Sequence, residues 1–171
     1  MKYRLFLPMD EIKNRKTTRL KNYNYNNPGY YFITFCTEDK KKLLCNIVGT
    51  GVLDGPEIIL TDYGKIADHY LQNMSHFYDG LILEKYVIMP NHIHLLIQIT
   101  SNVADVCKPN DSQISRFVGT FKRLCNKEYG CNIWQYRSHD HIIRGEKDYQ
   151  KIWAYIDQNP YMWANDCFYT E

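Results

Sequence analysis

Two histidines separated by one apolar residue form the stretch with the clearest capacity for chemistry. They stand as His92-Ile93-His94 inside an apolar run that extends to Ile97. In a β-strand successive side chains point to opposite faces, so His92 and His94 share one face. Two imidazoles side by side on a strand can bind one metal ion. The alternative is a pair of histidines with structural roles only.

A tyrosine and an asparagine near the C-terminus are the second feature. Residues 146–159 predict a helix that ends before Pro160. Tyr155 lies on the flank of its apolar face, and Asn159 follows one turn later on the same side. A packing tyrosine at the margin of the core is the competing interpretation. The predicted buried stripe of this helix consists of Tyr149, Ile152, Trp153 and Ile156, at i, i+3, i+4 and i+7.

Together these residues suggest phosphodiester chemistry. A divalent ion held by His92 and His94 can polarise a phosphodiester as a Lewis acid. Tyr155 can attack phosphorus and form a covalent phosphotyrosine. Asn159 can add an oxygen ligand, because Mg²⁺ and Mn²⁺ favour oxygen donors. The covalent bond would conserve the energy of the cleaved linkage, so rejoining strands would need no ATP.

The elements that must position these residues follow from hydrophobic patterning. We expect the order strand, helix, strand, strand, helix, strand, helix. Its first six elements match the ferredoxin-like split βαβ arrangement, an α+β fold with an antiparallel sheet and helices on one face. The tyrosine helix is an extra C-terminal element. The expected strands are 30–37, 81–89, 92–100 and a short one at Ile142-Ile143, with 57–60 as a further candidate, and the expected helices are 61–77, 112–129 and 146–159.

Composition limits the classes of protein that remain. The 171 residues suggest one domain, 1–171, in which 1–29 form an irregular basic segment. No apolar run reaches the length of roughly 18 residues that spans a bilayer. The first residues do not resemble an apolar signal sequence, so we expect a cytoplasmic protein. Six cysteines without a C-x-x-C pair favour free thiols over a zinc site or disulfides.

Basic side chains gather in three places, although the net charge is only +2. Such clusters with interleaved tyrosines suit a phosphate backbone and stacked bases. A solvated surface is the alternative for each cluster. They comprise Lys13, Arg15, Lys16, Arg19 and Lys21, then Lys40, Lys41 and Lys42, and then Lys122, Arg123 and Lys127.

Several motifs in one order resemble a known family. The run from Met89 to Leu96 resembles the HUH motif (U is a hydrophobic residue) of the single-tyrosine HUH transposases. The downstream pattern resembles the REP-associated tyrosine transposase branch, whose signature is Trp-Gln, Asp-His-Ile-Ile-Arg and Tyr-Ile-x-x-Asn-Pro-x-x-Trp-x-x-Asp. The match spans about residues 15–166. Its downstream parts here are Trp134-Gln135, Asp140-His141-Ile142-Ile143-Arg144, and the segment from Tyr155-Ile156 through Asn159-Pro160 and Trp163 to Asp166.

The resemblance implies a metal-dependent transposase that nicks and rejoins single-stranded DNA near palindromic hairpins. It implies metal ligands at His92 and His94, with Mg²⁺ or Mn²⁺ as cofactor, and a nucleophile at Tyr155. Asn159 stands where related enzymes often have Gln. Such enzymes act as monomers or as homodimers that exchange the tyrosine helix. The residues expected to contact DNA are Arg15, Lys16, Arg19, Lys122, Arg123 and Arg144.

Other interpretations remain open at this point. The chain could be a domesticated protein that binds hairpin DNA without cutting it, a replication-initiator nuclease or a metal-dependent RNA phosphodiesterase. Asp140 and His141 could contact metal or DNA, although a structural role is favoured slightly. Trp134 and Gln135 are expected to pack rather than to stack on bases, and Lys122 and Arg123 are equally compatible with either role.

Overall fold

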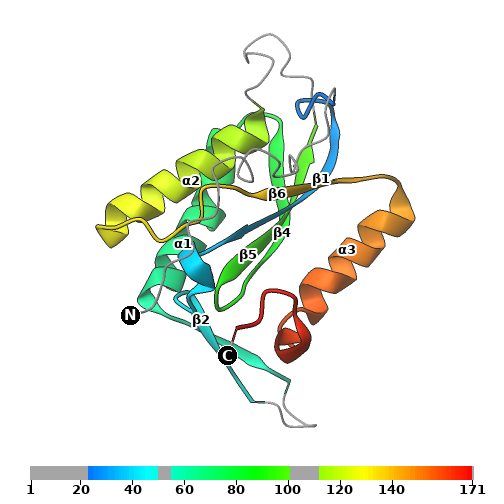
Figure 1. The fold of residues 1–171 in the computed structure, drawn as a ribbon. Helices are drawn as coiled ribbons and strands as arrows, with labels where there is room; N and C mark the ends of the chain where they lie inside the picture. The colour runs from blue at the N-terminus through cyan, green and yellow to red at the C-terminus, as the bar shows by residue number, and fades with distance from the viewer. Residues whose placement is uncertain (1–22, 50–54, 101–111, 171) are drawn as a thin grey trace, which may run out of the picture.

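A four-stranded antiparallel sheet forms the centre of the molecule (Figure 1). The computed structural model describes residues 23–49, 55–100 and 112–170. The strands are β1 (Gly29–Cys36), β4 (Leu81–Ile88), β5 (His92–Ile99) and β6 (His139–Ile143). Their spatial order is β4-β5-β1-β6, with every neighbouring pair antiparallel. The expected strands are therefore confirmed, and they are built from the aromatic and β-branched runs that favour extended structure.

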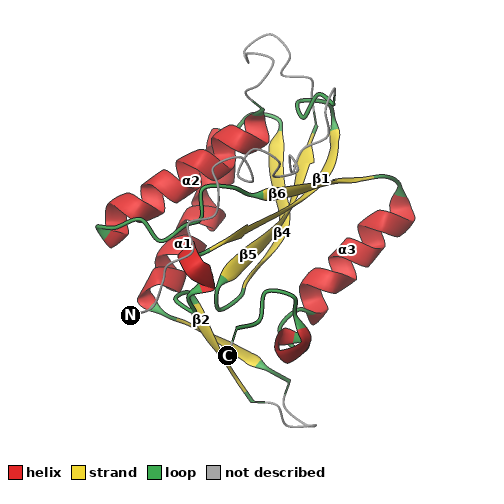
Figure 2. Ribbon diagram, viewed as in Figure 1, coloured by secondary structure: helices red, strands yellow, loops and turns green. Residues whose placement is uncertain are grey.

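The α-helices of the described residues cover both faces of this sheet (Figure 2). Helices α1 (Asp62–Met74) and α2 (Gln113–Tyr129) pack together on one face, and α3 (Glu146–Gln158) lies on the other. The succession β1-α1-β4-β5-α2-β6 with this strand order is the ferredoxin-like arrangement. The prediction of an α+β fold with an extra C-terminal helix is confirmed.

Local signals account for the helix ends. The Thr61 hydroxyl accepts a hydrogen bond from the Gly64 amide, and the Ser112 hydroxyl accepts one from the Ser115 amide. Both satisfy amides that have no partner within the helix. Gly130 ends α2 in the left-handed conformation, with φ of 71°. The predicted helix 61–77 is shorter as an α-helix, because Ser75–Phe77 form a 3-10 turn.

Both faces of the sheet are apolar, and the histidines lie on one of them. Tyr31, Ile33 and Phe35 of β1 point into the core beneath α1 and α2. The alternate residue Phe32 packs in a second cluster with Leu96 of β5 and Ile156 of α3. The side chains of His92 and His94 lie on this second face. Strand register pairs His94 with Thr34 and His92 with Cys36.

A two-stranded ribbon extends from the main sheet. It consists of β2 (Cys45–Val48) and β3 (Glu57–Leu60), of which only β3 was predicted. The backbone just before β2 lies against α1 so closely that a Cβ at Gly64 would collide with the Leu44 carbonyl oxygen. Glycine is therefore required at this helical position. The remaining 3-10 turns are Glu38–Lys40 and Trp163–Asn165.

One side chain of the predicted α3 stripe lies elsewhere. Trp153 is 36% exposed, whereas Ile156 is buried. The Trp153 ring lies against the edge strand β4. There the Lys85 ammonium is 4.0 Å from the ring centroid, and it also forms an ion pair with Asp157 at 2.6 Å. Because β4 is the last strand of the sheet, no further strand of the described residues covers the indole.

Two broader expectations can be compared with the structure. The five cysteines in the described part of the chain are all free thiols, as predicted. Among the described helices, none combines the length and apolarity needed to cross a bilayer.

Candidate active site

The tight turn before β5 presents the two histidines. Asn91 closes the turn, and its carbonyl oxygen accepts a hydrogen bond from the Thr37 amide at 2.9 Å. The Met89 amide bonds the His92 carbonyl oxygen at 2.9 Å. His92 and His94 then alternate with Ile93 along the strand, and both imidazoles are almost fully buried. The predicted shared face is confirmed.

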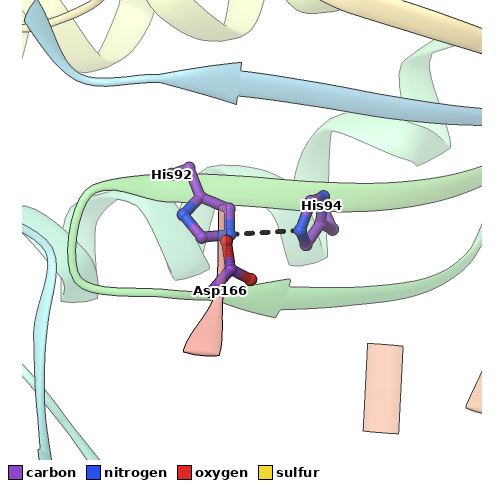
Figure 3. Close-up of side chains that lie close together, drawn as sticks. All are labelled: His92, His94 and Asp166. Carbon is purple, nitrogen blue, oxygen red and sulfur yellow. Dashed lines mark hydrogen bonds between the residues drawn. The ribbon is translucent and has the colours of Figure 1, made fainter. Parts of the chain in front are cut away.

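The two imidazoles face each other through their Nε2 atoms, which are 3.1 Å apart (Figure 3). His92 Nδ1 lies 2.9 Å from Asn91 Oδ1. The Asn91 amide group donates to the carbonyl oxygens of Lys40 and Phe168, which identifies Oδ1 as the acceptor. His92 therefore bears its proton on Nδ1, and its Nε2 lone pair points towards His94.

The tautomer of His94 depends on a threonine. Thr34 Oγ1 lies 2.7 Å from His94 Nδ1, and a hydroxyl can donate or accept. Two unprotonated Nε2 atoms would repel each other at 3.1 Å. Without a cation, His94 therefore bears its proton on Nε2 and donates a hydrogen bond to His92 Nε2. If both Nε2 atoms were to hold a cation, the His94 proton would lie on Nδ1 and Thr34 Oγ1 would accept a hydrogen bond from it. The same threonine supports both states.

Burial keeps both rings neutral. It lowers the pKa of His92 from 6.5 to about 4, an effect that the Asp166 carboxylate and the Asn159 amide partly oppose. Burial and then the neighbouring His92 hold the pKa of His94 well below its usual value. Neutral imidazoles have the lone pairs that metal coordination requires.

Asp166 completes this group, and no ligand role for it was predicted from the sequence. It follows the 3-10 turn Trp163–Asn165, and ligand atoms of His92, His94 and Asp166 all lie within 4.8 Å of one another. In Figure 3 its carboxylate reaches His92 from the C-terminal segment. These three side chains form a candidate metal-binding site. In the sequence, Asp166 is marked only as the last residue of the Trp-x-x-Asp motif. The motif does not indicate how far Asp166 lies from the histidines.

Asn159 is the fourth polar group at this site. It is 1% exposed, and its amide nitrogen donates to Asp166 Oδ2 at 2.8 Å. Its Oδ1 is buried and receives no hydrogen bond of good geometry from any residue that the structure describes. A buried carbonyl oxygen without a partner is costly. Beside two imidazole nitrogens and a carboxylate, this unpaired oxygen fits a divalent cation.

Tyr155 extends from α3 towards the same group. Its Oη lies 3.5 Å from His94 Nε2 and 3.5 Å from Asp166 Oδ2, distances that are long for hydrogen bonds. The side chain is 38% exposed, as expected for the flank of the helix. Burial, and next the charge of Asp166, raise the pKa of the phenol to about 12. The hydroxyl is therefore protonated at neutral pH.

The predicted DNA-contacting residues are dispersed. Arg15, Lys16 and Arg19 lie outside the described residues. Arg123 is exposed on α2, on the sheet face opposite the histidines. Arg144 is exposed just before α3, about three helical turns from Tyr155.

Lys122 is half-buried, and its ammonium is held by backbone carbonyl oxygens. Its ammonium donates to the carbonyl oxygens of Gln135 at 2.7 Å and Arg137 at 3.4 Å, and it lies 5.2 Å from the centre of the Phe35 ring. Burial lowers the pKa of Lys122 to about 8. This environment favours the structural alternative for Lys122.

The neighbouring motif residues also have structural partners. Trp134 is buried against Phe35 and Phe121, so the expectation that it packs is confirmed. His141 Nε2 lies 3.0 Å from Asp148 Oδ2, which also accepts the Arg144 amide. His141 thus helps to fix the start of α3.

The comparisons with known proteins point in one direction. No family model matches the chain. A protein of Haemophilus influenzae without a described function is 32% identical over 94% of this chain and 96% of its own length. A second protein of the same organism, named REP-associated tyrosine transposase, is 27% identical and covers 82% of this chain and 76% of its own.

A solved structure extends this similarity to the fold. It is a REP-associated tyrosine transposase bound to a REP hairpin, with a TM-score of 0.59 and 21% identity, covering 83% of this chain and 72% of the other. The named sequence relative, the shared fold and the ordered motifs agree, and the chain belongs to the REP-associated tyrosine transposases.

Proposed function

We propose that this protein nicks and rejoins single-stranded DNA beside palindromic hairpins, with Tyr155 as the nucleophile. The observation that supports this most strongly is the position of Tyr155 Oη, which lies 3.5 Å from His94 Nε2. His94 is one of the three candidate metal ligands, together with His92 and Asp166. A nucleophile beside a set of metal ligands suits attack on a phosphodiester. The hairpin partner follows from the structural relative, which is bound to a REP hairpin.

His92, His94, Asp166 and Asn159 would hold a divalent cation, Mg²⁺ or Mn²⁺. When bound, the cation supplies Lewis-acid polarisation of the phosphodiester. The two imidazoles contribute neutral nitrogen atoms, because their Nδ1 positions are occupied by Asn91 and Thr34. The carboxylate and the amide contribute oxygen atoms.

In the first step, Tyr155 Oη forms a bond to phosphorus and the bond from phosphorus to the 3′ oxygen breaks. The products are a 5′-phosphotyrosine and a strand that ends in a 3′-hydroxyl. The phenol proton must leave as the new bond forms, with Asp166 Oδ2 3.5 Å away as its acceptor, and the departing 3′ oxygen takes up a proton to become the hydroxyl. Attack by a 3′-hydroxyl on the phosphotyrosine reverses these bond changes and rejoins strands.

The test is a search for the covalent adduct. Labelled single-stranded hairpin DNA from the flanks of the gene is incubated with protein and Mg²⁺, Mn²⁺ or EDTA. We expect a denaturant-resistant adduct with wild type and metal, and none with Tyr155→Phe, which should still retard the DNA in native gels. Tyr161→Phe is the matched control, because Tyr161 is exposed two residues beyond Asn159 and should be dispensable.

Two outcomes would contradict the proposal. An adduct that persists in Tyr155→Phe would show that the nucleophile is another residue. Retarded DNA without an adduct under every metal would favour the alternative function, a hairpin-binding protein that does not cleave. An RNA hairpin of the same sequence, run in parallel, distinguishes a DNA enzyme from an RNA phosphodiesterase.

A further inference from the structure

A cavity of about 390 Å³ opens directly beside Tyr155. It lies between the α3 face of the sheet, α3 itself and the C-terminal segment. Tyr155 and His94 both form part of its wall, so any ligand inside it touches the candidate active site. Its volume is within the range of small-molecule sites in proteins, roughly 300 to 1,000 Å³.

The walls of the cavity are largely aromatic and aliphatic. Phe32 enters from β1, Ile152 from α3 and Phe168 from the C-terminal segment. The Phe32 ring is stacked on the His94 ring at 4.9 Å and meets the Tyr155 ring edge-on at 5.9 Å. Such walls suit a flat group with apolar faces. A nucleobase has this form, and every base can stack on aromatic side chains.

Two exposed basic side chains also line the cavity. Lys151 lines the cavity from α3, four residues before Tyr155 and therefore one turn away on the same side of the helix. His139 lines it from β6, and both residues are exposed to solvent. A cation one turn from the nucleophile suits a second phosphate of the same strand.

We propose that this cavity receives the unpaired base of a nucleotide adjoining the phosphate that Tyr155 attacks, while Lys151 binds the next phosphate. This inference rests on the proposed function and names a substrate subsite within it. The base leaves the stack and enters between Phe32, Ile152 and Phe168. Its entry fixes the strand so that the scissile phosphate lies at Tyr155.

The cavity recognises the presence of a base more than its identity. Thr34, a polar residue in the wall, already shares its hydroxyl with His94 Nδ1 at 2.7 Å. Few hydrogen-bonding groups are left to distinguish one base edge from another. We therefore expect removal of the base to matter more than its replacement by another natural base.

The test uses modified hairpin oligonucleotides. Each of the two nucleotides that adjoin the cleaved bond is replaced in turn by an abasic residue, by each natural base and by 2-aminopurine. At one of the two positions the abasic residue should slow single-turnover adduct formation about tenfold, the usual scale for losing one stacked base. Natural bases at that position should differ less. 2-Aminopurine there should lose fluorescence on binding to Tyr155→Phe.

Protein variants test the same subsite by changing the residues that line it. Ile152→Trp fills the cavity and should slow adduct formation on unmodified DNA while reducing the 2-aminopurine quench. Lys151→Gln should weaken hairpin binding and lower its salt dependence. Lys147→Gln, on the same helix but outside the cavity, is the control and should behave as wild type. The oligonucleotide experiment stands even if Ile152→Trp fails to fold.

The outcomes separate the two proposals. If adducts form at the full rate with abasic residues at both positions and 2-aminopurine keeps its fluorescence, the cavity is not a base site, although Tyr155 remains the nucleophile. If no adduct forms with any DNA, the proposed cleavage fails. A 2-aminopurine quench in the hairpin complex that Ile152→Trp abolishes would then still support the base site, and its absence would overturn it.

Discussion

Tyr155 Oη lies 3.5 Å from His94 Nε2 of the same chain. The helix that bears the tyrosine is attached to its own sheet, because Ile156 is buried against the face that presents Phe32 and Leu96. A second copy of the chain is therefore not needed to bring the nucleophile to the histidines. This relationship, together with the chemistry of the surrounding groups, leads to five predictions.

Nucleophile and ligands should act in cis. A mixture of Tyr155→Phe and His94→Gln should form no covalent adduct, because each chain lacks one half of its own site. The measurement is adduct formation by the mixed proteins after incubation that permits subunit exchange, with each variant mixed with wild type as control. Recovery of adducts in the doubly mutant mixture would mean that copies exchange α3.

Thr34 should tune the affinity of the site for metal. Thr34→Val keeps the shape of the side chain but removes the hydroxyl 2.7 Å from His94 Nδ1. Loss of such a supporting hydrogen bond weakens metal binding by about 10- to 100-fold. Isothermal titration with Mn²⁺ measures this directly, with Thr100→Val, just beyond the far end of β5, as control. Equal affinities for wild type and Thr34→Val would refute this role.

Asp166 should influence both metal binding and the pKa of the Tyr155 phenol. Its charge is the second largest cause of the raised pKa of Tyr155, after burial. Asp166→Asn should therefore lower that pKa from about 12 towards the ordinary value of 10.0. NMR titration of tyrosines labelled at the ring carbon that bears the oxygen, in metal-free protein, reports this shift. The same variant should bind Mn²⁺ more weakly, and an unchanged pKa would contradict the electrostatic assignment.

Metal-free protein should lose stability in mild acid. His92 has a pKa of about 4 when folded and an ordinary value of 6.5, so the unfolded chain binds the proton first. The contribution of His92 to the free energy of unfolding should be constant above pH 6.5, and it should fall as the pH drops from 6.5 to about 4. Urea unfolding in EDTA at several pH values measures the slope. His92→Gln combined with His94→Gln should flatten it, and an unaltered slope would count against the assignment.

Lys122 should matter for stability more than for DNA affinity. Lys122→Met removes the hydrogen bonds to the Gln135 and Arg137 carbonyl oxygens, at a cost of roughly 1 to 3 kcal/mol in the free energy of unfolding. Hairpin affinity and its salt dependence should change little, since the carbonyl oxygens of Gln135 and Arg137 already hold the half-buried ammonium. Lys127→Met, exposed on the same helix, is the control for stability. A reduced salt dependence for Lys122→Met would instead make it a phosphate contact.

Local patterns were enough to predict much of the sheet and one part of the site. Strand alternation places His92 and His94 on one face whatever the rest of the chain does. Helical periodicity places Tyr155 on the flank of α3, and capping signals at Ser112 and Gly130 predict the ends of α2. These features depend on neighbours within a few residues, so they can be read from the sequence alone.

The rest depends on contacts between distant segments, which periodicity does not encode. Asp166 joins the histidines only because the chain turns back after α3 and brings its C-terminal segment to the start of β5. Trp153 is exposed because the edge strand leaves its ring uncovered, and the Lys122 ammonium is held in place because the 135–137 backbone offers two carbonyl oxygens. In each case the role of the side chain is set by a partner that lies elsewhere in the sequence.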